Sequence, residues 1–111
     1  MQWTMLTSDD QLQQLVERSK ETPQVIFKHS NRCSISSVAY QRIDKAQKPA
    51  ATEFWLLDVI SHRSLSQQVA QRFGVMHESP QVLVIKNAEC VFDESHLGIS
   101  MHDIAEQVQV A

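Results

Sequence analysis

The chain lacks the features that would place it in several large classes of protein. Its ten lysines and arginines are scattered among thirteen acidic residues, for a net charge of -3, and without a basic cluster this balance argues against nucleic-acid binding. No apolar run approaches the roughly 20 residues of a membrane-spanning helix. The N-terminus, MQWTMLTSDD, has neither the basic region nor the apolar core of a signal peptide. We therefore expect a cytoplasmic protein that binds neither nucleic acid nor membranes.

Cysteine is also scarce, with only Cys33 and Cys90, far apart in the sequence. Without a secretion signal we expect no structural disulfide between them. The five histidines lack the paired spacing of common metal sites, such as C-x₂-C or H-x₃-H, so we expect no metal site. No repeat, low-complexity tract or linker is present. The 111 residues, 42% of them hydrophobic, therefore fit one domain spanning residues 1–111.

Hydrophobic periodicity predicts helices that alternate with strands. The expected elements are a helix from Ser8 to about Lys20, a strand over 24–29, a helix over 34–47, a strand over 53–60, a helix over 61–73, strands over 82–86 and 89–93, and a helix over 100–110. The strand–helix–strand unit makes the first two strands parallel. The short connection at Asn87-Ala88 forces a hairpin, although Ala88 tolerates a tight turn poorly and a wider turn stays open.

This order predicts an α/β fold with a central four-stranded mixed sheet flanked by helices on both faces. The helix over 34–47 is expected to turn four apolar residues inward, namely Ile35, Val38, Ala39 and Ile43. Asp58 falls at the end of an apolar strand, where we expect it to meet solvent rather than to act as a buried acid.

The stretch VIFKHSNRCSIS, residues 25–36, is the most informative part of the chain. An apolar strand gives way to a polar turn, and Cys33 lies where a helix begins, so backbone N–H groups and the helix dipole would favour its thiolate. His29 and Arg32 add titratable or positive charge. Lowering a thiol pKa by about two units from ~8.5 requires only about 2.7 kcal/mol. The alternative, a small buried hydrophobic residue, stays open on spacing alone, although the polar neighbours argue against it.

Ser36 stands three residues after Cys33, where a dithiol oxidoreductase carries its second cysteine. Serine cannot exchange disulfides, so the chain cannot close a local C-x-x-C bridge and a monothiol route follows. Ser36 either hydrogen-bonds the Cys33 thiolate or only caps the helix. Cys90, beside Val91 and Phe92, is expected to be a buried structural thiol, and its approach to Cys33 as a resolving thiol stays open. His77 and Glu78 either line the site or lie in a solvated loop.

The element order, with a cysteine between the first strand and the next helix, resembles the thioredoxin fold over almost the whole chain. Pro80 then corresponds to that family's cis-proline, which faces the cysteine; an ordinary trans proline at a strand entry is the alternative. The chain more closely resembles the YtxJ-like group, the monothiol bacilliredoxins, through VIFKHSNRCSIS, HESPQVLVIKN and ESHLGIS. It departs from that group at Asn31, often Thr, and at Ala88, often Gly.

The resemblance implies thiol–disulfide exchange with low-molecular-weight thiols, with bacillithiol as co-substrate and no bound cofactor. Cys33 would be the nucleophile that takes bacillithiol from S-thiolated proteins, and a second free thiol would regenerate it. The residues expected to bind substrate are Arg32, Ser36, Ser79 and Pro80, and His29 is expected to tune the thiol. The alternative function is a non-catalytic redox sensor or stress-related binding protein with the same fold. The oligomeric state is left open.

Overall fold

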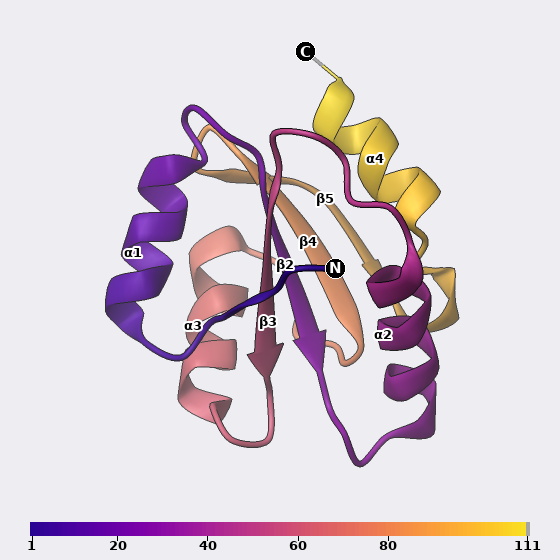
Figure 1. Ribbon diagram of the computed structural model, residues 1–111. Coiled ribbons are helices and arrows are strands. Elements are labelled where there is room, and N and C mark those ends of the chain that lie inside the picture. The colour runs from indigo at the N-terminus through magenta and orange to yellow at the C-terminus, as the bar shows by residue number, and fades with distance from the viewer. Residues whose placement is uncertain (111) are drawn as a thin grey trace.

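Five strands form one mixed sheet in the computed structural model of the chain, which describes residues 1–110 (Figure 1). The elements are β1 (Thr4–Met5), α1 (Asp9–Arg18), β2 (Gln24–His29), α2 (Ser34–Lys45), β3 (Glu53–Asp58), α3 (Arg63–Phe73), β4 (Gln81–Lys86), β5 (Glu89–Ser95), the 3₁₀ turn η1 (His96–Gly98) and α4 (Met101–Gln109). The strand order is β1-β3-β2-β4-β5. Strands β1, β3 and β2 are mutually parallel, and β4 runs antiparallel to both β2 and β5. The predicted α/β fold is therefore confirmed.

The sheet has five strands rather than the expected four. The additional strand, β1, pairs in parallel with β3 through Thr4 and Met5, ahead of the first element expected from the sequence. Two residues are too short to display the alternation that identifies a strand. The pairing is fixed instead by the next residue, Leu6, whose side chain is fully buried and whose N–H donates to Leu56 O at 2.9 Å.

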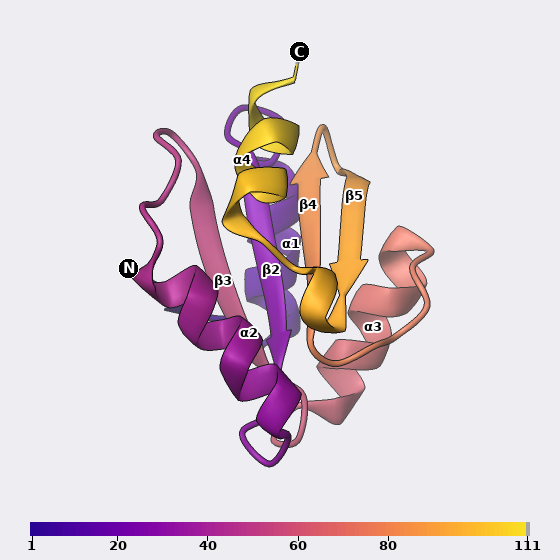
Figure 2. The same ribbon diagram turned by 90° about the vertical axis from the view of Figure 1, so that its right-hand side faces the viewer.

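Two hydrophobic cores lie on opposite faces of the sheet, which is why β2 and β4 are apolar almost throughout. One face is covered by α1 and α3, and the other by α2 and α4 (Figures 1 and 2). Ile26 belongs to the core under α1 and α3, whereas Val25 and Phe27 belong to the core under α2 and α4. Among residues 1–110, no helix combines the length and apolar character needed to cross a bilayer.

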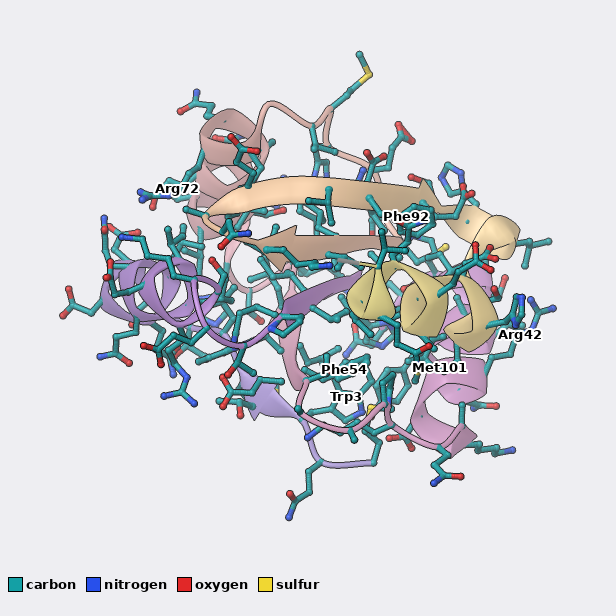
Figure 3. The ribbon with its side chains drawn as sticks, turned by 90° about the horizontal axis from the view of Figure 1, so that it is seen from above. Trp3, Arg42, Phe54, Arg72, Phe92 and Met101 are labelled. Atoms are coloured by element: carbon teal, nitrogen blue, oxygen red, sulfur yellow. The ribbon has the colours of Figure 1, made fainter. Side chains whose placement is uncertain are left out.

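The segment before β1 packs through Trp3 onto the core under α2 and α4. Its ring lies 5.7 Å from that of Phe54 and 5.6 Å from that of Tyr40, measured between centroids, and Figure 3 shows Trp3 and Phe54 together. The indole N–H donates to the carboxylate of Asp44 at 2.8 Å. Since Tyr40 and Asp44 are on α2, Trp3 ties the start of the chain to that helix.

The inward face of α2 differs from the expected one. Ala39 and Ile43 are buried, but Ile35 and Val38 are 41% and 45% exposed. Ser36 takes the inward position instead and is fully buried. Because 36, 39 and 43 are spaced for one helical face, a buried hydroxyl in the first turn rotates the two β-branched residues outward.

The β4–β5 hairpin closes with the tight two-residue turn, not the wider one. Asn87 and Ala88 have φ angles of 53° and 65°, both in the left-handed region, which an alanine adopts at a cost. Ser19 at the end of α1 holds the turn, because its backbone oxygen accepts from Asn87 N–H and its hydroxyl from Ala88 N–H, both at 2.9 Å. These two tertiary hydrogen bonds thus offset the cost of the left-handed conformation at Ala88.

Candidate active site

The predicted site residues come together at the carboxyl ends of β2 and β3, at the lower end of the molecule in Figure 1. There the loops into α2 and α3 lie beside the segment that enters β4. Polar side chains concentrate in such loops because parallel strands end at the same edge of the sheet. The site therefore has one wall from each face of the sheet.

Cys33 is the N-cap residue of α2 and is partly exposed. Its N–H donates to Ser30 O at 3.2 Å, and its carbonyl accepts the first helical bond, from Ser37 N–H at 3.0 Å. The N–H groups between these two positions have no partner within the helix. The first turn of α2 also contains no acidic residue. Cys33 therefore sits at the positive end of an uncompensated helix dipole, the setting that the sequence predicted.

Ser36 and His29 form a hydrogen-bonded unit behind the cysteine loop. The Ser36 hydroxyl accepts from Ser30 N–H at 3.0 Å and lies 2.7 Å from His29 Nδ1. The His29 ring stacks on Tyr40, with centroids 4.9 Å apart. Burial lowers the pKa of His29, and the charge of Asp58 opposes the change. The buried Ser36 thus holds the turn that carries Cys33, and its contact with substrate stays a prediction.

Asp58, the last residue of β3, pairs in register with His29. Its carboxylate accepts from Ile60 N–H at 3.0 Å and from Ser61 N–H at 3.2 Å. Burial raises the pKa of this carboxyl, but hydrogen bonds from Ser61 and Ile60 outweigh burial and hold the pKa below its usual value. The Asp58 carboxylate therefore makes its hydrogen bonds within its own loop.

Pro80 follows a cis peptide bond after Ser79, as the resemblance implied. Because Lys28 pairs with Gln81 across the antiparallel β2–β4 ladder, Pro80 lies opposite His29, beside the loop that leads to Cys33. Pro80 O accepts from His96 N–H at 2.9 Å, so η1 is tied to the same place. The backbone N–H and C=O of Ser79 make no hydrogen bond to another residue within 1–110.

Arg32 is exposed in the turn before Cys33 and makes no salt bridge with any residue that the structure describes. The sequence left open whether His77 and Glu78 line the site. The Glu78 carboxylate lies 3.5 Å from His96 Nε2. That contact joins the segment before Pro80 to η1. Arg32 thus lies within the cysteine loop, and Glu78 lies in the segment that leads to Pro80.

Cys90 lies at the other end of the sheet. It pairs with Ile85, which in turn pairs with Gln24 at the start of β2. At ~3.3 Å per residue, the length of β2 separates this level from the cysteine loop by about 17 Å, whereas a disulfide needs Cα atoms within about 7 Å. Burial raises the pKa of the Cys90 thiol to about 11. In this fold Cys90 packs against the core and cannot reach Cys33.

Sequence reasoning missed one buried group, Lys28. It is 0% exposed on the face under α3, and its Nζ lies 3.1 Å from His77 Nδ1, which also lies 3.1 Å from the Ser66 hydroxyl. Burial lowers the pKa of Lys28 to about 8. The available signal was a lysine continuing an apolar run inside a central strand. No group of three or more potential metal-ligating residues forms among residues 1–110.

Comparisons with known proteins identify the family and agree with the fold. The family model described as "Monothiol bacilliredoxin BrxC" matches residues 4–104. A solved structure described as "A putative oxidoreductase with a thioredoxin fold" is 33% identical, with a TM-score of 0.82, over 93% of this chain and 90% of that one. A thioredoxin from Malassezia sympodialis is 15% identical, with a TM-score of 0.75, over 98% and 92% of the two chains. One from Trypanosoma brucei brucei is 10% identical, with a TM-score of 0.77, over 96% and 88%. The two thioredoxins show the fold alone.

Proposed function

The chain belongs to the monothiol bacilliredoxin BrxC family, and on this basis we propose that it is a monothiol thiol–disulfide oxidoreductase. It removes a low-molecular-weight thiol, bacillithiol, from protein mixed disulfides through Cys33. It needs no bound cofactor, because the chemistry uses only sulfur atoms. Its partners are proteins that carry a thiol modification and the small thiol itself.

The reaction proceeds in two exchanges. The Cys33 thiolate attacks the bacillithiol sulfur of the mixed disulfide, and the protein sulfur leaves with the bonding electrons and takes up a proton. A free bacillithiol thiolate then attacks the bacillithiol sulfur bonded to Cys33. This second step releases bacillithiol disulfide and restores the Cys33 thiolate. The protein thiol is thus released in reduced form and one free bacillithiol is consumed, since it becomes joined in a disulfide to the bacillithiol removed from the protein.

The surrounding residues have distinct roles in this proposal. The free N–H groups at the start of α2 stabilise the Cys33 thiolate. The unpaired backbone of Ser79, beside Pro80, receives the substrate in an extended pose. Arg32 contacts the substrate from the exposed turn. His29 positions the turn through Ser36 and sets the polarity behind the sulfur.

The observation that carries the proposal is the separation of the two cysteines. Cys33 lies at a helix N-terminus with a buried serine at the position three residues later. Cys90 lies at the far end of the sheet with its thiol pKa raised by burial. The chain therefore has one sulfur suited to exchange and no partner within reach to resolve it. An external thiol must do so.

The test is multiple turnover on a bacillithiol–protein mixed disulfide with free bacillithiol in excess. The released protein thiol is quantified by intact mass against time. Wild type and the matched control Cys90→Ser should both turn over many equivalents, while Cys33→Ser should release none above the uncatalysed rate. Loss of turnover in Cys90→Ser would refute the monothiol mechanism. Release limited to one equivalent in wild type would favour a redox sensor over an enzyme.

A further inference from the structure

A pocket of about 290 Å³ opens on the α3 face of the sheet, where β3 leads into α3. It is lined by Val59, Ile60, Arg63, Ser66, Gln67 and His77. Its volume is near the lower end of the range for small-ligand sites. Val59 N–H donates to His29 O at 3.0 Å, so the rim of the pocket begins at the strand end that leads to Cys33.

A buried cation, Lys28, contacts the lining residue His77. Lys28 is 0% exposed, and no carboxylate lies within 4.0 Å of its Nζ among residues 1–110. Its polar contact is His77 Nδ1 at 3.1 Å. Buried charges in proteins are normally paired with an opposite charge. A lysine paired only with an imidazole leaves positive charge under this pocket without a counter-ion.

His77 contacts Lys28 and also lines the pocket. Burial and the charge of Lys28 lower the pKa of His77, while Glu78 opposes the shift. Since a protonated lysine can only donate, Nδ1 of the neutral ring accepts, and the ring proton lies on Nε2. That nitrogen is on the side of the ring away from Lys28. The exposed His77 ring, which lines the same pocket as Arg63, therefore carries an N–H donor that does not face Lys28.

The acidic groups nearby are engaged elsewhere. The Asp58 carboxylate is bonded to Ile60 and Ser61 in its own loop. The Glu78 carboxylate is held against His96 at 3.5 Å. Arg63 also borders Asp9 in an adjoining depression, yet no salt bridge of 4.0 Å or less joins them. None of these carboxylates therefore pairs with Arg63 or Lys28 in the part of the chain that the structure describes.

We propose that this pocket binds a carboxylate of the low-molecular-weight thiol that Cys33 exchanges, with Arg63 and His77 as its donors. The inference rests on the proposed function and adds the part of the small thiol that the protein recognises. An arginine and a ring N–H suit a carboxylate, because both are donors and charge-assisted hydrogen bonds are the stronger ones. Recognition of this kind selects anionic thiols over neutral ones.

The experiment compares two disulfides as reagents for Cys33. Glutathione disulfide carries carboxylates, whereas hydroxyethyl disulfide is neutral, and adduct formation by each is timed by intact mass. Arg63→Gln should slow the reaction with glutathione disulfide about tenfold, the effect of one lost charge-assisted hydrogen bond. Its reaction with hydroxyethyl disulfide should stay within about twofold of wild type, which also shows that the variant is folded.

Arg72→Gln is the matched control, since Arg72 is exposed at the other end of the same helix (Figure 3). It removes the same charge from the protein and should leave both rates unchanged. Equal slowing of both reagents by Arg63→Gln, an equal effect of Arg72→Gln, or no effect of either would overturn the carboxylate subsite and leave the proposed function intact. Failure of both reagents to modify Cys33 in wild type would overturn the proposed function, and the subsite with it.

Discussion

Replacing Lys28 by methionine should stabilise the protein at neutral pH. The side chain is 0% exposed and its ammonium is held against a neutral ring rather than a carboxylate. Methionine has a similar length and no charge to desolvate. The His77 ring keeps a hydrogen-bond donor after the change, because the Ser66 hydroxyl also lies 3.1 Å from its Nδ1. Replacement of buried charges by well-packed apolar residues is often neutral or stabilising.

The size of the effect follows from the pKa of Lys28. Burial lowers this pKa from 10.5 to about 8, and at 1.36 kcal/mol per pKa unit the folded state is penalised by about 3 kcal/mol when the amine is charged. Because the folded pKa lies below the unfolded one, the unfolded state binds more protons between the two values. The penalty is therefore fully present below pH 8, falls as pH rises, and vanishes above pH 10.5.

Urea unfolding of wild type and Lys28→Met across pH 7 to 10.5 measures this directly. The variant should be more stable by up to about 3 kcal/mol at pH 7, and the two curves should converge as pH approaches 10.5. Lys45→Met, at an exposed position on α2, should stay within about 0.5 kcal/mol of wild type throughout. A less stable Lys28→Met, or a difference that does not shrink with pH, would refute the reasoning.

Three further perturbations test other parts of the structure. Ser36→Ala should cost about 2 kcal/mol in urea unfolding, because a partly buried backbone N–H and an imidazole lose their partner; an unchanged midpoint would contradict that role. Ala51→Gly should add about 0.5 kcal/mol, since the exposed Ala51 has a φ of 54°, whereas its neighbour Ala50→Gly should destabilise; equal effects would contradict the strain. In native protein iodoacetamide should alkylate Cys33 and spare Cys90, whose thiol pKa is about 11, until urea is added; equal native rates would contradict the burial of Cys90.

The strands and helices were predictable because their patterns are local. β2 was expected over 24–29 and is Gln24–His29, and the helices expected from Ser8 and from residue 100 are α1 and α4, with Ser8 and Ser100 as their N-caps. The position of Cys33 followed from the same patterns, since a strand end and a helix start fix it without tertiary information. The end of β2 and the start of α2, which position Cys33, could therefore be predicted from the sequence.

The features that the sequence missed depend on contacts between distant residues. β1 exists because Leu6 is buried and β3 is available beside it. The tight turn at Ala88 depends on Ser19, far away in the chain. Lys28 was overlooked because its partner His77 follows β2 by a helix, a strand and a second helix. Burial of polar groups such as Ser36 is decided by the helix face as a whole, and hydrophobic periodicity assigned that face to Ile35 and Val38 instead.

The central claim is that Cys33 alone exchanges disulfides with a small thiol. Intact-protein mass spectrometry after incubation with oxidised bacillithiol, and separately with glutathione disulfide, tests it most directly. We expect one adduct, mapped to Cys33 and formed faster from bacillithiol, with Cys90 unmodified. An unmodified Cys33 with both reagents, or an adduct on Cys90 in its place, would contradict it.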